Sequence, residues 1–178
     1  PSPVSSCTCT RAPSSSTTAA AVRRFIARVA SESSTPTVVV ALAPGAGLLP
    51  FADDVEAIVV LFLAGASTGT AAARVLFGDV NPSAKSPVTF PVSEDDVVAP
   101  CPATQPDCSY DEGALVGYRA LEGRAVRFPF GAGESYTTFE LALRAPPRAA
   151  QGALAVAVRA TVARVRAGAE VVQLYVRF

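Results

Sequence analysis

The chain has 178 residues, half of them hydrophobic, and its fifteen basic and fifteen acidic side chains leave a formal net charge of zero. This length allows one domain or one domain with part of another. The balanced charge, with no basic stripe among aromatic residues, argues against nucleic-acid binding. The chain contains no histidine, which excludes Ser-His-Asp and Cys-His catalysis and any histidine-ligated metal site.

The first segment, residues 1–18, is rich in Ser, Thr and Pro and predicts a disordered arm. It lacks the apolar core of a signal peptide, and the chain opens on Pro1. We interpret this start as that of a mature product, a fragment or an incomplete gene model. Cys7 and Cys9 within it are too close in sequence to bond easily to each other.

An amphipathic helix is predicted next, capped by one of residues 16–18. Its apolar side chains recur at the spacing of one helical face: Val22, Phe25, Ile26 and Val29. Pro36 ends the helix, and the apolar runs 37–43 and 57–63 predict parallel strands buried on both faces. The longest apolar stretch, 57–66, is shorter than the roughly 20 residues of a membrane-spanning helix, so we expect no membrane partner.

A second helix is predicted over the residues before Gly78, which is a plausible C′ residue. Its apolar stripe consists of Ala72, Val75 and Leu76. The following segment LFGDVNPSAKSPVTFP (76–91) turns at Asn81-Pro82, and Pro87 sets φ before a β-prone run. Lys85 has no partner that the sequence identifies. Helices alternating with continuously apolar strands predict an α/β architecture in which helices cover a mostly parallel sheet.

The C-terminal part has a different pattern. Residues 92–112 are acidic and rich in Pro and Cys, which predicts a loop, and residues 114–123 form a short strand or a turn. The runs 154–162 and 170–178 alternate apolar and polar residues with period two. Such alternation predicts half-buried antiparallel strands of a β-sandwich, which is incomplete at Phe178.

Several short patterns bear on cofactors and metals. Gly45-Ala-Gly47 after a strand lacks the third glycine of a dinucleotide-binding turn, and residues 65–74 lack the Lys-Ser/Thr of a P-loop. We therefore expect no cofactor. Cys101 and Cys108 flank a short loop and suit a disulfide in an oxidising compartment. The alternative, a zinc site made of two cysteine pairs, lacks CxxC spacing, so we expect no metal.

Acidic residues cluster at Asp53-Asp54, at 94–96 and at Asp111-Glu112. Two carboxylates that flank a scissile bond are the minimum for glycoside hydrolysis. Runs of acids in loops are more often solvated surface. Spacing alone favours the surface interpretation.

Three ordered stretches resemble the C-terminal half of family 3 glycoside hydrolases, the β-glucosidase family. Residues 37–91 resemble its strand, turn, strand, helix and "GDxNPSGKLPVTFP" segment, with Ala84 and Ser86 in place of Gly and Leu. Residues 110–140 are similar to its "Y-x-EG-x-x-VGYR…FPFG-x-GLSYTTFE" segment, with Glu134 in place of Leu. An acid at that position would need a partner such as an arginine if it were buried. AGAEVVQLYV (167–176) resembles the signature strand of the fibronectin type III-like domain that ends many members.

The resemblance implies a fold and a division into domains. The fold is a layered α/β sandwich with a mostly parallel sheet, followed by an incomplete antiparallel, fibronectin III-like β-sandwich. After the arm, residues 19–140 would be the family's C-terminal α/β domain without its upstream part. Residues 141–178 would be a truncated fibronectin type III-like domain.

The resemblance also implies an activity. The parent enzyme would hydrolyse terminal β-glycosidic bonds through a covalent glycosyl-enzyme intermediate, and its partners would be a β-linked oligosaccharide or glycoside and an N-terminal (β/α)8 barrel. The family's nucleophilic Asp lies in that barrel and its acid/base Glu upstream of the strand at Thr37, where Glu32 is the only acid. No catalytic residue is therefore assigned, and we expect the chain alone to be inactive.

Three residues are candidates for substrate binding: Tyr110, Glu112 and Tyr136. Packing and hydrogen bonding in loops is the alternative role for them. The parent would be secreted, extracellular or vacuolar. A non-catalytic carbohydrate-binding or structural module is the alternative function.

Overall fold

The computed structural model describes residues 16–98, 101, 104, 107–150, 152–163 and 166–176. Cys7, Cys9 and residues 1–15 of the predicted arm lie outside the described residues. The first helix begins at Ser16, so residues 16–18, which we expected in the arm, are helical. No helix in the described ranges is both long and apolar enough to cross a membrane.

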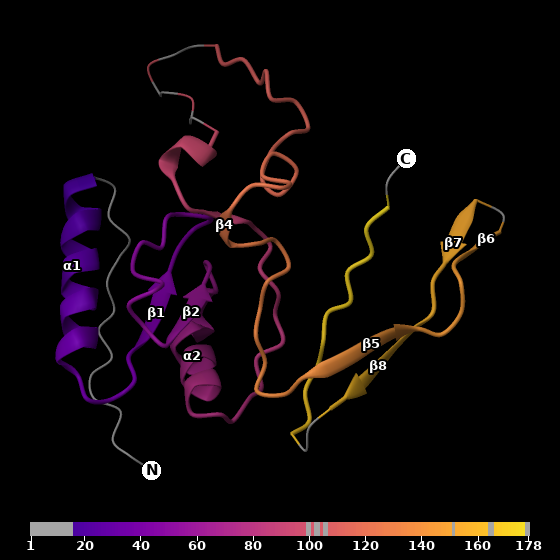
Figure 1. Ribbon diagram of the computed structural model, residues 1–178, viewed down its shortest axis with the longest axis horizontal. Coiled ribbons are helices and arrows are strands. Elements are labelled where there is room, and N and C mark those ends of the chain that lie inside the picture. Colours follow the sequence, from indigo (N-terminus) through magenta and orange to yellow (C-terminus); the bar gives the residue numbers. More distant parts are fainter. Residues whose placement is uncertain are drawn as a thin grey trace. The chain divides into compact units, whose positions relative to one another are not determined.

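The described chain interleaves helices and short strands in its first half and has only strands among its elements after η2 (Figure 1). Its elements are α1 (Ser16–Glu32), β1 (Val38–Leu42), β2 (Ala57–Leu61), the 3-10 turn η1 (Gly65–Ser67), α2 (Thr68–Leu76), β3 (Phe90–Pro91), the 3-10 turn η2 (Glu94–Asp96), β4 (Val126–Phe128), β5 (Phe139–Leu143), β6 (Arg148–Ala150), β7 (Ala153–Ala155) and β8 (Val158–Val162). These strands form four two-stranded sheets, β1-β2, β3-β4, β5-β8 and β6-β7. The fold thus combines helices with small sheets.

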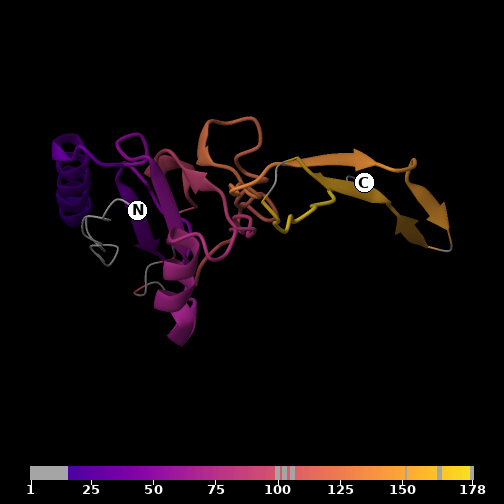
Figure 2. The same cartoon turned by 90° about the horizontal axis from the view of Figure 1, so that it is seen from below.

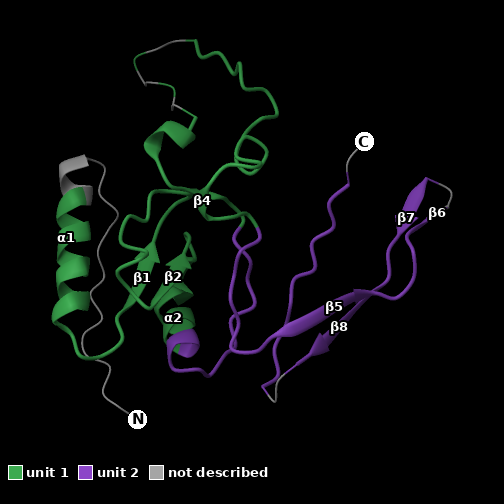
Figure 3. Cartoon of the chain, viewed as in Figure 1, with its two compact units in different colours: residues 1–73, 87–130 green, residues 74–86, 131–178 purple. Residues whose placement is uncertain are grey.

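The chain divides into two compact units (Figure 3). Unit 1 consists of residues 1–73 and 87–130, and unit 2 consists of residues 74–86 and 131–178. The domain boundary expected at residue 140 stays a prediction. The segment 74–86 and residues 131–140 join the C-terminal part because they contact it through side chains described below.

The parallel pair of unit 1 confirms the predicted β pairing. β1 and β2 run parallel, in a register from Val38 beside Ala57 to Leu42 beside Leu61. Burial on both faces, however, was a wrong prediction, because both strands are half-buried at their centres and β1 is exposed at its ends. The core cluster contacts Val39 of β1 with Ile58 and Val60 of β2, which share one face of the pair, and burial of the other face would need a second layer packed on it.

The core of unit 1 lies around aromatic residues from its loops and from β3. Leu49, Phe51 and Phe90 are buried together, and the ring of Phe90 meets that of Phe128 edge-on at 6.2 Å between centroids. Ile26 of α1 packs against the same cluster. The turn after β1 therefore contributes core residues as well as reversing the chain.

Two turns bear on predictions made from the sequence. Gly78 follows α2 with φ +79°, and its amide donates to the carbonyl of Val75 at 3.0 Å, as expected of a helix-ending glycine. Residues 114–123 form turns and not a strand, because the amide of Leu121 donates to the carbonyl of Gly117. This settles an alternative that the sequence left open.

The strands of unit 2 pair antiparallel, as predicted (Figures 1 and 2). The expected half-burial is wrong, because the described side chains of β7 and β8 are all exposed. Residues 170–176, predicted as a strand, carry no strand pairing in the described chain. Alternation marks the two faces of a strand, but burial of one face needs a second layer, and no second layer covers these strands in the described part of the chain.

Candidate functional site

Tyr136, one of the three predicted substrate-binding residues, is held at its backbone, its hydroxyl and its ring. The hydroxyl donates to the carbonyl of Val75 in α2 at 2.6 Å. Its backbone amide donates to Oδ1 of Asn81 at 2.8 Å. The guanidinium of Arg166 lies over the ring, 4.8 Å from its centroid. These contacts make Tyr136 a bridge between α2, the loop after it and the C-terminal segment.

Asn81 joins three segments of unit 2. Its side-chain oxygen accepts hydrogen bonds from Ser135 Oγ and from the Tyr136 amide, both at 2.8 Å. Its side-chain nitrogen donates to the carbonyl of Ala167 at 3.1 Å. Because a single amide offers both acceptor and donor atoms, one side chain can tie segments that are far apart in sequence. The sequence had shown Asn81 only as part of a turn.

Lys85, for which the sequence identified no partner, makes both a hydrogen bond and an ion pair. Its Nζ donates to the carbonyl of Gly133 at 2.7 Å and lies 3.0 Å from Oε1 of Glu170. The two side chains are only 17% and 13% exposed, so the ion pair is largely removed from water. Partners so far apart in sequence gave no local pattern by which this pair could have been found.

Tyr110 and Glu112 lie together in one turn of unit 1. The carbonyl of Tyr110 accepts from the Gly113 amide at 3.1 Å, and that of Glu112 accepts from the Leu115 amide at 2.9 Å. The Tyr110 side chain is 77% exposed, whereas Glu112 is half-buried. Tyr136 belongs to unit 2, so the three candidates are not members of one unit. Their assignment to substrate binding stays a prediction.

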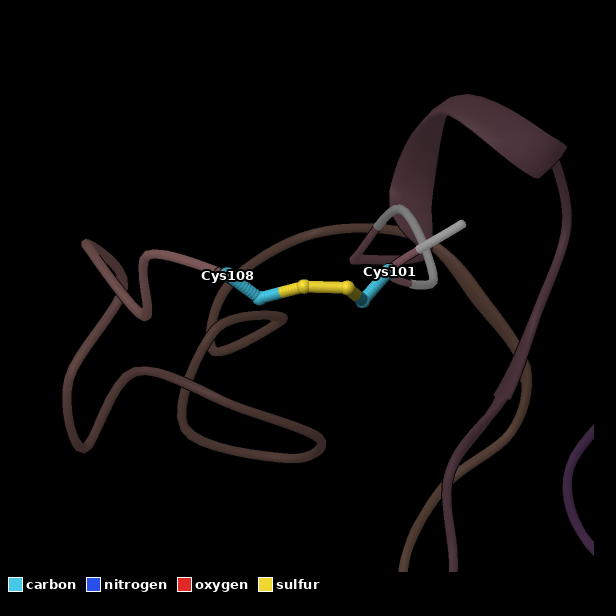
Figure 4. The surroundings of a disulfide bond; sticks show 2 residues. All are labelled: Cys101 and Cys108. Atoms are coloured by element: carbon cyan, nitrogen blue, oxygen red, sulfur yellow. A yellow bond between two sulfur atoms is a disulfide. The ribbon is translucent and has the colours of Figure 1, made fainter. Parts of the chain in front are cut away.

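Cys101 and Cys108 are joined as a disulfide, with their Cα atoms 6.0 Å apart (Figure 4). That separation lies within the usual range for a disulfide. Nearby in the chain, Asp96 at the end of η2 pairs with Arg124 at 2.5 Å. No group of three or more metal-ligating side chains gathers anywhere in the described ranges, and Cys7 and Cys9 of the zinc alternative lie outside them.

The acidic clusters lie mainly at the surface. Asp53 is 77% exposed and pairs with Arg127 at 2.6 Å, and Asp54 and Asp95 are also exposed. Glu134, the acid in a segment where an apolar residue is expected, is exposed as well. It therefore needs no buried partner.

Sequence comparison relates the chain to a family of glycosidases. The model of the glycosyl hydrolase family 3 C-terminal domain matches residues 13–136. Beta-glucosidase B of Emericella nidulans is 39% identical over 157 residues, which cover 78% of this chain and 18% of that protein. Thermostable beta-glucosidase B of Acetivibrio thermocellus is 37% identical over 136 residues, covering 72% and 18%. The chain thus spans less than a fifth of the length of these relatives.

Solved structures agree with that relation. DesR, a beta-glucosidase from Streptomyces venezuelae solved in complex with D-glucose, matches with a TM-score of 0.71 and 34% identity, covering 83% of this chain and 20% of that one. Beta-D-glucoside glucohydrolase from Trichoderma reesei matches with a TM-score of 0.61 and 28% identity, covering 71% and 19%. The similarity therefore extends from sequence to backbone.

Proposed function

The chain belongs to glycosyl hydrolase family 3, within that family's C-terminal domain, and from this premise we propose that it is the C-terminal portion of a β-glucosidase-type enzyme. The enzyme would hydrolyse terminal β-glycosidic bonds. The observation that carries the proposal is the match of 72–78% of this chain to proteins named beta-glucosidases. Because the chain spans 18% of their length, the activity belongs to the parent protein.

The chemistry divides between the parent protein and this chain. A retaining glycosidase needs one carboxylate as nucleophile and a second carboxyl as acid and base. Asp53, 77% exposed and paired with Arg127, has the character of a surface residue. The resemblance to the family implies that the nucleophile comes from a barrel and the acid/base from the region before Thr37. This chain would supply a wall of the site on the aglycone side and a brace for the domains around it.

The finer architecture belongs to the same proposal. Residues 19–140 would be part of a layered α/β sandwich, and residues 141–178 would begin a fibronectin type III-like domain. The parallel β1-β2 pair supports the first assignment, and the antiparallel β5-β8 and β6-β7 pairs support the second. The Cys101–Cys108 disulfide supports a secreted, extracellular or vacuolar location, because such bonds persist in oxidising compartments.

The experiment that tests the proposal starts from the reading frame upstream of Pro1. A (β/α)8 barrel encoded in frame is expected, and the whole translated protein should release the aryl group from an aryl β-glucoside. Replacing the barrel's candidate nucleophilic Asp by Asn should abolish that release. An unrelated upstream domain, or a whole protein that binds but does not hydrolyse glucosides, would instead support a carbohydrate-binding or structural module.

A further inference from the structure

A long loop, residues 97–125, joins η2 to β4 within unit 1 (Figure 1). Its described residues form no helix and no strand. Loops of such length in a compact domain are usually either disordered or used for binding. The contacts of its second half, residues 107–124, favour binding, because they fix this part of the loop at several points.

Hydrogen-bonded turns follow one another along residues 110–124. After the turns that begin at Tyr110 and Glu112, the amide of Leu121 donates to the carbonyl of Gly117 at 3.2 Å. The amide of Arg124 then donates to the carbonyl of Leu121 at 3.0 Å. The backbone of this part is therefore held by its own short-range bonds.

Three side chains pack the later turns. Leu121 is buried, at 7% exposure. The ring of Tyr118 lies against that of Phe130, with 4.9 Å between centroids and 34° between planes. The guanidinium of Arg119 lies over the ring of Tyr118, 4.9 Å from its centroid. Aromatic pairs of this kind stabilise beyond the apolar area that they bury, so this end of the loop has a fixed position.

An ion pair closes the loop at its base. Oδ1 of Asp96 lies 2.5 Å from a guanidinium nitrogen of Arg124, and the Asp96 side chain is only 8% exposed. Ser93 caps η2, since its Oγ accepts from the amide of Asp95 at 3.2 Å. A carboxylate so far removed from water needs a compensating charge, and Arg124 supplies it. On the other side of Tyr110, the disulfide at Cys108 closes the loop a second time.

We propose that Asp96 and Arg124 are positioning residues, which act with the Cys101–Cys108 disulfide to hold the turn 110–115 in a preformed shape for a β-linked oligosaccharide. This inference rests on the proposed function of the parent enzyme. The turn carries a tyrosine, whose ring can pack on the apolar face of a sugar, and a glutamate, which can accept from sugar hydroxyls. A loop that is fixed in advance binds more tightly, because less ordering is left to occur on binding.

Limited trypsin digestion of the full 178-residue chain, followed by mass spectrometry, tests the closure at a site inside the turns. Cleavage after Arg119 should become about tenfold faster in Asp96→Asn, as expected for a lost charge-assisted contact. Arg124→Gln should accelerate it more, because the buried carboxylate then has no countercharge. The double variant should be cleaved more slowly than Arg124→Gln, since it carries no such charge. Cleavage after Arg28 in α1 should keep its rate.

Asp53→Asn is the matched control, because it makes the same change in another Asp–Arg pair of unit 1. Asp53 is 77% exposed in its pair with Arg127, so its loss should leave cleavage after Arg119 unchanged. Unchanged cleavage after Arg119 in both Asp96→Asn and Arg124→Gln would overturn the closure. Equal acceleration at the α1 site would overturn it too, since the whole unit would then be opening.

The whole translated protein tests the binding role. In Asp96→Asn, the KM for cellotetraose should rise about tenfold while kcat keeps its value, because binding is lost equally from the ground state and the transition state. The KM for an aryl β-glucoside, which has a single sugar, should change less. Faster cleavage after Arg119 with an unchanged KM for cellotetraose would overturn the binding role. A parent protein without hydrolysis would count against the proposed function instead, and the dissociation constant of cellotetraose from calorimetry would then replace KM in the same comparison.

Discussion

At the scale of single residues, Asn81 and Lys85 of the segment 76–91 have structural roles. Asn81 and Lys85 each bind a main-chain carbonyl of a distant segment, Ala167 for Asn81 and Gly133 for Lys85. Hydrogen bonds to main-chain atoms do not require a particular partner residue, only a backbone that comes close enough. Gly133 permits this approach, since a Cβ there would lie 2.5 Å from the carbonyl oxygen of Ala84.

Replacing Asn81 should destabilise unit 2. Asn81→Ala leaves Ser135 Oγ, the Tyr136 amide and the Ala167 carbonyl without this partner, and we expect a loss of about 2–3 kcal/mol in the free energy of unfolding. Asn81→Asp keeps the acceptor and loses the donor, so its loss should be smaller. Urea denaturation monitored by circular dichroism measures both. A change below about 0.5 kcal/mol in Asn81→Ala would contradict the role given to Asn81.

Replacing Thr137 should not lower the free energy of unfolding, in contrast to replacing Asn81. Its side chain is 4% exposed, and its hydroxyl has no hydrogen-bond partner among the described residues. Thr137→Val removes a buried polar atom at nearly constant shape, so the free energy of unfolding should stay constant or rise by about 1 kcal/mol. Thr138→Val, at an exposed neighbouring position, serves as control and should change it by less. A loss above about 1 kcal/mol in Thr137→Val alone would show that the hydroxyl is bonded.

At the scale of elements, short strands depend on the few side chains that they bury. β3 has two residues, yet Phe90 in it is the most buried member of the unit 1 core, at 3% exposure. Its edge-on contact with Phe128 connects β3 to β4. The β-prone run Val-Thr-Phe therefore contributes to the fold mainly by packing its phenylalanine in the core, and it forms only a short strand pairing.

Phe90→Ala should be the most damaging core change in unit 1. Truncation of a buried phenylalanine costs about 3–5 kcal/mol, because apolar contact is lost and a cavity remains. Phe77→Ala is the matched control, since Phe77 is 70% exposed, and should cost less than about 1 kcal/mol. Thermal unfolding of both variants measures the difference. Similar melting temperatures for the two would contradict the placement of the core.

The second prediction for an element concerns the Cys101–Cys108 disulfide in the loop after η2. A digest of the unreduced chain should yield one peptide pair that joins Cys101 to Cys108, and reduction should separate it. Closing a loop of this length stabilises the folded form by about 2–3 kcal/mol in the chain-entropy account. Cys101→Ser with Cys108→Ser should show that loss in urea denaturation. A cross-link from either residue to Cys7 or Cys9 would contradict the pairing.

At the scale of the whole molecule, exposed apolar surface is the main feature. Leu141 and Leu143 in β5 and Leu154 in β7 are about half exposed or more. A two-stranded sheet without a covering layer is marginal in water. The chain covers 18% of its first relatives' length, and we propose that the rest of such a parent protein supplies the covering layers.

The prediction at this scale concerns activity. The 178-residue chain by itself should not turn over an aryl β-glucoside, because the family's nucleophile and acid/base are assigned outside it. The rate of aryl release should equal that of buffer, with an intact family 3 β-glucosidase as positive control. The prediction would be contradicted if this chain hydrolysed the glucoside and lost that activity when one of its own carboxylates, such as Glu112, was changed to the amide.

Local patterns in the sequence by themselves determined much of the chain up to the end of α2. The stripe of Ile26 and Val29 predicted α1, the two apolar runs predicted β1 and β2 and their parallel pairing, and Gly78 predicted the end of α2. The ordered motifs of residues 37–140 identified the family. These succeeded because helix periodicity, strand hydrophobicity and turn glycines act between residues that are close in the chain.

Only the tertiary structure decided how distant segments meet. The pairing of Lys85 with Glu170, the contact of Asn81 with Ala167 and the hydroxyl bond of Tyr136 to Val75 join residues with no local signal. Burial was likewise undetermined, since β1, β2 and the alternating strands of unit 2 are more exposed than their patterns predicted. The physical reason is that a pattern specifies which face of an element can be buried, whereas burial itself depends on which other segments lie against that face.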